Sequence, residues 1–367
     1  MLRHITEHNY YTQVKRFFEQ YERLLMPGTM VLGFVLDILT FKSIEVNTAF
    51  VLLGIHLVLV TAAITYLNIY REAPQTATAW KYLRVVAPLV LQFSLGALLS
   101  SSLIFYSFSS AITVSWPLLG TLAFLMLSNE IYKQYYLRPM VQFTVYFFVL
   151  FALSSIMLPF FFASISPGLF ILAGGGSLGI TGFYVKLIAK RSSAVDMRRG
   201  RLVRSIGITY IIMNVLYFTN VIPPVPLTVR DAGIHHEVSR SGPKYRIVAE
   251  HESFFRKLVP TITMHIKPGE PVYAYTAIFA PSELDTDIVH HWQYYDEKRH
   301  EWVTAGRARY PLIGGREDGY RGYSFWRNLR EGTWRVYVET ERGQIMGKIR
   351  FRVTYADPKT ERAILWK

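Results

Sequence analysis

Residues 141–185 read VQFTVYFFVLFALSSIMLPFFFASISPGLFILAGGGSLGITGFYV and contain no Asp, Glu, Lys or Arg. A helix needs about 20 mainly apolar residues to cross the hydrocarbon core of a membrane. The stretch is long enough for two such helices, Val141–Phe162 and Ile165–Val185, which a tight hairpin would join. The sequence therefore predicts a membrane protein with several spans.

Further apolar runs of similar length precede and follow this stretch. They are Leu24–Phe41, Ala49–Tyr70, Val85–Tyr106, Ser109–Ser128 and Ile206–Ile222. Together the runs predict an all-α membrane bundle of seven transmembrane helices over residues 27–224. Residues 1–26 place apolar side chains at helical spacing, which predicts an amphipathic helix, either in the cytoplasmic interface or packed under the bundle.

The distribution of Lys and Arg predicts the orientation of these spans. Cytoplasmic loops carry an excess of both residues. The three short loops that follow the odd-numbered spans hold only Lys42. The N-terminal segment and the other loops hold the remaining 16 that precede Val225, which are Arg3, Lys15, Arg16, Arg23, Arg71, Lys81, Arg84, Lys133, Arg138, Lys186, Lys190, Arg191, Arg198, Arg199, Arg201 and Arg204. We therefore expect a cytoplasmic N-terminus in the inner membrane and a periplasmic C-terminal domain.

The loop from Lys186 to Arg204 is the most basic. Attraction to the anionic cytoplasmic leaflet is one interpretation, at about 1 kcal/mol per well-placed charge, with Arg198, Arg199, Arg201 and Arg204 as the contacts. The other interpretation is that these charges only fix the topology. The net charge of +14 does not indicate nucleic acid binding, because many of the basic residues flank spans.

Polar residues inside spans are candidate functional groups. Asp37 lies in the first predicted span, His56 in the second, and Glu130 at the end of the fourth. Neighbouring antiparallel helices would bring Asp37 and His56 together, as a proton relay or as a structural link between helices.

We expect Pro223, Pro224 and Pro226 to stop the last helix, and residues 225–367 have a different pattern. Apolar and polar residues alternate with a period of two, most clearly around Trp334–Val338 and Ile349–Tyr355. The last two strands should form a hairpin near Glu341–Gln344. We expect seven or eight strands in an all-β, immunoglobulin-like antiparallel sandwich.

Seven of the ten histidines fall in this C-terminal region. His235-His236 and His290-His291 are adjacent pairs, and neighbours on a strand point to opposite faces, so neither pair can chelate one ion from a regular strand. We predict no metal site and no cofactor. The chain has no cysteine, which excludes disulfides, thiolate metal sites and a cysteine nucleophile.

Arginines and aromatic residues interleave between Arg307 and Arg335. The arginines are Arg307, Arg309, Arg316, Arg321, Arg327, Arg330 and Arg335, and the aromatics are Tyr310, Tyr320, Tyr323, Phe325, Trp326 and Trp334. This combination is typical of sites that recognise carboxylates, phosphates, sugars or proteins. A solvated basic sheet face with inward aromatics would give the same pattern.

Three short motifs resemble one bacterial family. They are His290-x-Trp292, then Arg321-x-x-Ser324, then Gly332-x-Trp334-x-Val336 with a closing Gly343. Their order and spacing resemble the domain of unknown function 2914. The resemblance implies a non-enzymatic, envelope-associated module in a bacterial membrane protein, and it brings no catalytic residue.

Two functions are compatible with these features. The first is a membrane-anchored binding or scaffolding protein whose outer domain contacts an envelope polymer, lipid or partner protein. Its candidate contacts are His290, Trp292, Arg321, Ser324, Trp326 and Trp334. The second is a transporter or a lipid-processing membrane enzyme in which Asp37, His56 and Glu130 line a cavity. No catalytic constellation favours an enzyme.

Overall fold

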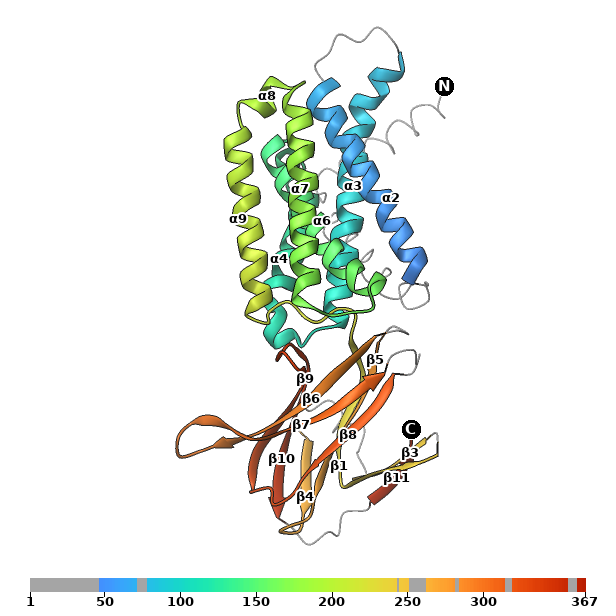
Figure 1. Ribbon diagram of the computed structural model, residues 1–367, viewed down its shortest axis with the longest axis vertical. Helices are drawn as coiled ribbons and strands as arrows, with labels where there is room; N and C mark the ends of the chain where they lie inside the picture. Colours follow the sequence, from blue (N-terminus) through green and yellow to red (C-terminus); the bar gives the residue numbers. More distant parts are fainter. Residues whose placement is uncertain are drawn as a thin grey trace, which may run out of the picture. The chain divides into compact units, whose positions relative to one another are not determined.

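The computed structural model describes residues 46–70, 78–242, 244–250, 262–280, 284–313, 319–355 and 362–367 (Figure 1). The described residues up to Ile104, with Leu118–Met157 and Phe170–Asn214, form one compact unit. The second unit contains Phe105–Pro117, Leu158–Leu169 and everything described from Val215 onward. The first unit is helical, and the second contains all the described strands.

The described residues between Val46 and Phe218 form a series of long helices with two short ones between them. The elements are α2 (Val46–Thr65), a π-helical turn η1 (Tyr66–Tyr70), α3 (Thr78–Phe108), α4 (Ile112–Ile131), α5 (Lys133–Tyr136), α6 (Pro139–Phe161), α7 (Pro167–Ala189), α8 (Ser193–Asp196) and α9 (Arg199–Phe218). Six helices of the described chain, α2 with η1, α3, α4, α6, α7 and α9, are long and apolar enough to cross a membrane.

These six helices coincide with the predicted second to seventh spans, with boundaries that move by up to seven residues. The first predicted span, Leu24–Phe41, lies outside the described residues, as do Asp37 and the predicted interfacial helix over residues 1–26. Proline begins both α6 and α7, at Pro139 and Pro167. The first helical position favours proline because its amide has no intrahelical partner there.

The last helix ends before the prolines that the sequence suggested as its stop. Asn220 adopts a left-handed conformation with φ 59°. The amide of Val221 bonds to the carbonyl of Leu216 at 2.9 Å, and that of Asn220 to the carbonyl of Tyr217 at 3.1 Å. This pair of hydrogen bonds is the Schellman arrangement, which closes the helix at Phe218.

Hydrogen bonds between polar side chains join the helices of the first unit. The Thr61 hydroxyl donates to Tyr146 Oη at 3.1 Å, and the Asn68 amide donates to Gln142 Oε1 at 2.7 Å. Tyr184 Oη donates to the Thr61 carbonyl at 2.8 Å. Such contacts are common between packed membrane helices, where few other partners exist for polar groups.

The second unit has eleven described strands in three sheets. They are β1 (Thr228–His235), β2 (Glu237–Ser241), β3 (Lys244–Glu250), β4 (Ile262–Ile266), β5 (Val272–Phe279), β6 (Asp285–Asp296), β7 (Glu301–Ile313), β8 (Tyr320–Trp326), β9 (Gly332–Thr340), β10 (Ile345–Tyr355) and β11 (Arg362–Trp366). The sheet orders are β1-β5-β8, β4-β10-β9-β6-β7 and β11-β3-β2.

Two of the sheets share one apolar core. The five-stranded sheet contributes Trp292, Trp334 and Phe351, and the β1-β5-β8 sheet contributes Val272 and Ala274. These side chains occupy alternate positions of their strands, so the other positions form the opposite face of each sheet.

The prediction of an antiparallel all-β domain is confirmed for most strand pairs. The hairpin near Glu341–Gln344 is confirmed by the antiparallel pairing of β9 with β10. One pair differs, because β4 runs parallel to β10. A strand that joins a sheet from a distant part of the chain leaves no local turn signal, so its direction is not readable from the sequence.

Candidate functional site

Three residues of the family-like motifs meet inside the second unit. Trp292 Nε1 donates to Ser324 Oγ at 3.0 Å, and the same hydroxyl lies 2.9 Å from His290 Nδ1. On the other side of the imidazole, Nε2 lies 3.0 Å from Thr276 Oγ1, which is 2.6 Å from Tyr310 Oη. A neutral imidazole satisfies both contacts, since one ring nitrogen donates and the other accepts.

This polar network is sealed from water. His290 is 0% exposed and Ser324 is 7% exposed. Burial lowers the pKa of His290 to about 3, so the ring stays neutral. The pair lacks both the solvent access and the orienting carboxylate of a serine–histidine nucleophile. The geometry favours a structural link between the two sheets.

Two glycines make room for the large residues around the network. A Cβ on Gly322 would lie 2.2 Å from Cε2 of Tyr310. A Cβ on Gly306 would lie 2.2 Å from Cη2 of Trp326, whose ring stacks on Trp292 with centroids 6.5 Å apart. Both rings therefore lie directly against the backbone of a neighbouring strand.

The remaining candidates of the binding hypothesis are spread over the domain. Trp334 is buried beside Phe351, and its Nε1 donates to the Arg330 carbonyl at 2.8 Å. Arg321 lies on β8, where its carbonyl accepts from Tyr245 Oη at 3.1 Å. Burial raises the pKa of the neighbouring Tyr275 to about 12, although the charge of Arg321 opposes this rise.

A second arrangement lies on the outward face of the five-stranded sheet. Its rows follow from the strand register: Arg352 pairs with Thr263 of β4 and with Thr333 of β9, and Arg350 pairs with Arg335 of β9. Lys348, Arg350 and Arg352 are exposed, whereas the residues between them are buried. We call the outward residues Thr263, Thr333, Arg335, Lys348, Arg350 and Arg352 the basic face.

Arg335 is held in place on this face by three neighbours. Its Nε donates to Gln293 Oε1 at 2.7 Å. Its guanidinium carbon lies 3.9 Å from the ring centroid of Trp302 and 4.8 Å from that of Tyr337. Cation–π contact of this kind orients an arginine without neutralising it. Burial lowers the pKa of Arg335, and the like charge of Arg350 lowers it further.

The other end of the same sheet face has carboxylates. Arg309 pairs with Asp287 at 3.4 Å and with Glu341 at 2.7 Å, and Arg307 lies 3.5 Å from Glu339. By contrast, no carboxylate of the described residues lies within ion-pair distance of Lys348, Arg350 or Arg352. Among the described residues, the sheet face is therefore neutralised at one end and positive at the other.

A pocket of about 250 Å³ opens on the positive end. The described residues that line it are Thr263, Thr333, Arg350 and Arg352. Two guanidinium groups and two hydroxyl groups supply hydrogen-bond donors, and an arginine fork matches the oxygens of phosphate or carboxylate groups. The chemistry of this pocket suits an oxyanion.

A third polar cluster joins the end of β3 to β4 and to His236, which lies between β1 and β2. Glu250 Oε1 is 3.1 Å from His236 Nε2, and Glu250 Oε2 is 3.1 Å from His265 Nδ1. Burial alone would raise the pKa of Glu250, but hydrogen bonds from His236 and from the backbone and side chain of His265 lower it to about 2. Within the described ranges, no three such side chains converge in a way that could hold a metal ion.

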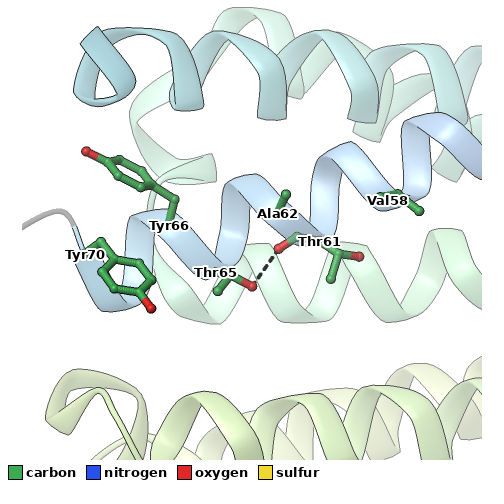
Figure 2. A pocket seen from close by; sticks show the side chains of 6 residues that line it. All are labelled: Val58, Thr61, Ala62, Thr65, Tyr66 and Tyr70. Atoms are coloured by element: carbon green, nitrogen blue, oxygen red, sulfur yellow. Dashed lines mark hydrogen bonds between the residues drawn. The ribbon is translucent and has the colours of Figure 1, made fainter. Parts of the chain in front are cut away.

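In the first unit a pocket of about 540 Å³ runs along α2 and η1. Figure 2 shows the described side chains that line it, which are Val58, Thr61, Ala62, Thr65, Tyr66 and Tyr70. His56 lies elsewhere, with Nδ1 3.3 Å from Ser94 Oγ, and Glu130 pairs with Lys133 at 3.2 Å. Neither candidate is among the lining residues of this pocket in the described part of the chain.

The four arginines predicted to contact anionic lipid lie just before or within the first turns of α9, the last helix of this unit. Arg198 precedes α9, and Arg199, Arg201 and Arg204 lie in its first turns. All four are exposed. Two of them bond to local carbonyls, Arg198 to Ala194 at 2.9 Å and Arg204 to Gly200 at 3.4 Å.

Sequence reasoning did not single out the pocket residues. The alternation of Lys348, Arg350 and Arg352 with apolar residues was visible, and it predicted a strand. The hydroxyl partners Thr263 and Thr333 come from two other strands, so only the register of the sheet brings them to Arg352.

Comparisons with solved structures find weak likenesses. A β-glucosidase from Listeria innocua is 10% identical over 35% of this chain and 16% of its own, with a TM-score of 0.19. An immunoglobulin-like protein from Pseudomonas aeruginosa is 12% identical over 35% and 98%, with a TM-score of 0.20. An alkylpurine DNA glycosylase from Pseudomonas fluorescens is 10% identical over 82% and 97%, with a TM-score of 0.23. Likenesses at this level carry no argument.

No curated protein matches the chain significantly. One family model does match, and it covers strands that hold most of the basic face and of the buried network, from the start of β6 to Val353 in β10. Residues 285–353, in the C-terminal region of the chain, match the family described as protein of unknown function DUF2914.

Proposed function

We propose that the protein is a multi-pass protein of the bacterial inner membrane that presents its β-domain to the periplasm as a binding module for an anionic envelope polymer. The observation that carries the proposal is the basic face, where cations lie side by side at one end of a rigid sheet. Among the described residues no carboxylate neutralises Lys348, Arg350 or Arg352.

The orientation in this proposal rests on the loop charges. Of the 17 Lys and Arg residues before Val225, 16 lie on the side that the positive-inside rule assigns to the cytoplasm. Seven spans then lead the C-terminal domain to the opposite side. The six apolar helices of the described chain support this count for all spans but the first.

The architecture of the domain also suits binding rather than catalysis. His290 and Ser324 are buried and hydrogen-bonded to each other. The side chains available for binding at the surface are therefore mainly arginine, threonine and aromatic residues. A face built on strands holds its side chains more precisely than a loop does. Electrostatic attraction of this kind falls as salt screens the charges.

The test uses full-length protein in phosphatidylcholine nanodiscs and immobilised lipopolysaccharide, an anionic envelope polymer. Wild type should bind. Arg335→Gln/Arg350→Gln/Arg352→Gln should lose at least tenfold in affinity, because it removes three charges that no described carboxylate neutralises. Arg307→Gln/Arg309→Gln should change the affinity less than threefold, because Glu339 and Glu341 already neutralise these two arginines. Equal losses in both variants would reject the proposal.

A further inference from the structure

Four side chains converge on the pocket of the basic face. Thr263, Arg352 and Thr333 lie in one row across β4, β10 and β9, because Arg352 is the register partner of both threonines. Arg350 lies two residues earlier on the same strand face. Two residues on a strand span about 7 Å, so the two guanidinium groups reach the same small volume from adjacent rows.

The pocket has more positive charge than its described surroundings balance. Arg350 has a ring contact with Trp302 at 6.0 Å, and no described carboxylate pairs with it or with Arg352. Arg335, in the next row, adds a third cation, whose pKa is lowered partly by Arg350. Like charges this close favour the entry of an anion.

The number of donors selects among anions. Each guanidinium carries five N–H donors, and each threonine carries one hydroxyl donor. A carboxylate has two oxygens, which the arginine forks alone can satisfy. A terminal phosphoryl group has three oxygens, which can accept hydrogen bonds from both arginine forks and from the threonine hydroxyls. Its charge of about −1.5 to −2 at neutral pH matches the two arginine charges.

We propose that the pocket formed by Thr263, Thr333, Arg350 and Arg352 binds the terminal phosphoryl group of a phosphate monoester. This inference rests on the proposed function and names the chemical group that the basic face recognises. The forks of Arg350 and Arg352 hold the phosphoryl oxygens, and the threonine hydroxyls donate to those that remain. Arg335 lies outside the pocket and contributes through its charge.

The direct test is calorimetric titration of full-length protein in phosphatidylcholine nanodiscs with inorganic phosphate, and with acetate for comparison. Phosphate should bind, and acetate should bind at least tenfold more weakly. Arg350→Gln and Arg352→Gln should each weaken phosphate binding at least tenfold, and Thr333→Val two- to fivefold. Arg309→Gln, on the same sheet face but ion-paired, should leave it unchanged.

The conservative variant Arg350→Lys/Arg352→Lys separates fork geometry from charge. Lysine keeps the charge but loses the planar fork. A loss of at least fivefold supports the geometry described here, whereas unchanged affinity would overturn it. Both arginines are exposed, so folding of these variants should be intact, as circular dichroism would verify.

Two sources of the phosphoryl group can be distinguished. If it belongs to a lipid headgroup, phosphatidic acid in the nanodisc will compete with added phosphate and weaken its apparent affinity, and Arg352→Gln will abolish this competition. If it belongs to a glycan or a soluble ester, the apparent affinity will be the same with and without phosphatidic acid.

The outcomes separate this inference from the proposed function. If lipopolysaccharide binds through the basic face but inorganic phosphate does not bind, the phosphoryl pocket is rejected and the binding module remains. If phosphate binds as expected but lipopolysaccharide does not, the pocket remains and the envelope polymer is rejected as the partner.

Discussion

His290 Nδ1 and Ser324 Oγ lie 2.9 Å apart on strands that belong to different sheets of the C-terminal unit. The contact is buried, and Trp292 donates to the same hydroxyl. The family-like residues thus link the two layers that enclose the core. The outward residues of β9 and β10 are positioned by the same sheet, so the network supports the surface that we propose to bind.

Removal of the Ser324 hydroxyl should destabilise the domain. Ser324→Ala leaves Trp292 Nε1 and one nitrogen of His290 buried without their partner. Such a change costs about 1–3 kcal/mol. Thermal unfolding followed by near-ultraviolet circular dichroism should show a lower midpoint. Ser241→Ala, at an exposed position, should leave the midpoint unchanged. Equal midpoints for wild type and Ser324→Ala would contradict the account.

Side chains at the two packed glycines should be poorly tolerated. Gly322→Ala places a methyl group against Tyr310, and Gly306→Ala places one against Trp326. Overpacking of this kind costs about 1–3 kcal/mol. Gly347→Ala is the matched control, because its Cβ would meet its nearest neighbour, Val229, at an ordinary 3.4 Å. The packing model fails if the control lowers the unfolding midpoint as much as the two test variants do.

Acid should destabilise the domain through buried neutral histidines. Burial lowers the pKa of His290 to about 3, and burial with the charge of Lys367 lowers that of His235 to about 4. Unfolded histidine takes up a proton as the pH falls through 6.5. The contribution of these histidines to the free energy of unfolding is therefore fully present above pH 6.5. Below that pH it declines by about 1.4 kcal/mol per pH unit for each histidine. Unfolding midpoints that stay constant between pH 7 and 5 would contradict this.

A substitution of His235 isolates the part of this acid sensitivity that His235 causes. Neither ring nitrogen of His235 has a hydrogen-bond partner among the described residues. His235→Phe keeps a ring against Tyr275 and removes the buried polar atoms. We expect equal or higher stability at pH 7, because an unsatisfied buried polar group is costly, and a shallower loss between pH 7 and 5. A steeper loss than in wild type would refute the role given to His235.

The absence of cysteine makes the orientation easy to measure. Lys298→Cys lies in the β6–β7 turn, and Ala194→Cys lies in α8, and both positions are exposed. A membrane-impermeant maleimide should label Lys298→Cys in cells with a permeabilised outer membrane. It should label Ala194→Cys only after the inner membrane is opened. The reverse pattern would place the β-domain in the cytoplasm.

The sequence predicted the parts of this structure that local patterns determine. Apolar length placed α6 and α7 within a few residues, and period-two alternation placed the β9–β10 hairpin. His290 and Trp292, two residues apart in their motif, lie on one strand face and share the partner Ser324.

The rest depends on contacts between distant segments. Thr276 and Tyr310 complete the buried network from strands that share no motif with His290. Thr263 reaches Arg352 only because β4 pairs in parallel with β10. Even the end of α9 was misplaced, because the left-handed Asn220 stops the helix before the prolines do.

The most direct measurement of the central claim is the salt dependence of lipopolysaccharide binding by full-length protein in nanodiscs. The account predicts that wild-type affinity falls steeply between about 50 and 200 mM salt, as it does when several cations meet a polyanion. Arg335→Gln/Arg350→Gln/Arg352→Gln should bind weakly with a much flatter slope, and Arg307→Gln/Arg309→Gln should follow wild type. If the affinity of the triple variant falls with salt as steeply as that of wild type, the claim that the basic face is the binding surface is contradicted.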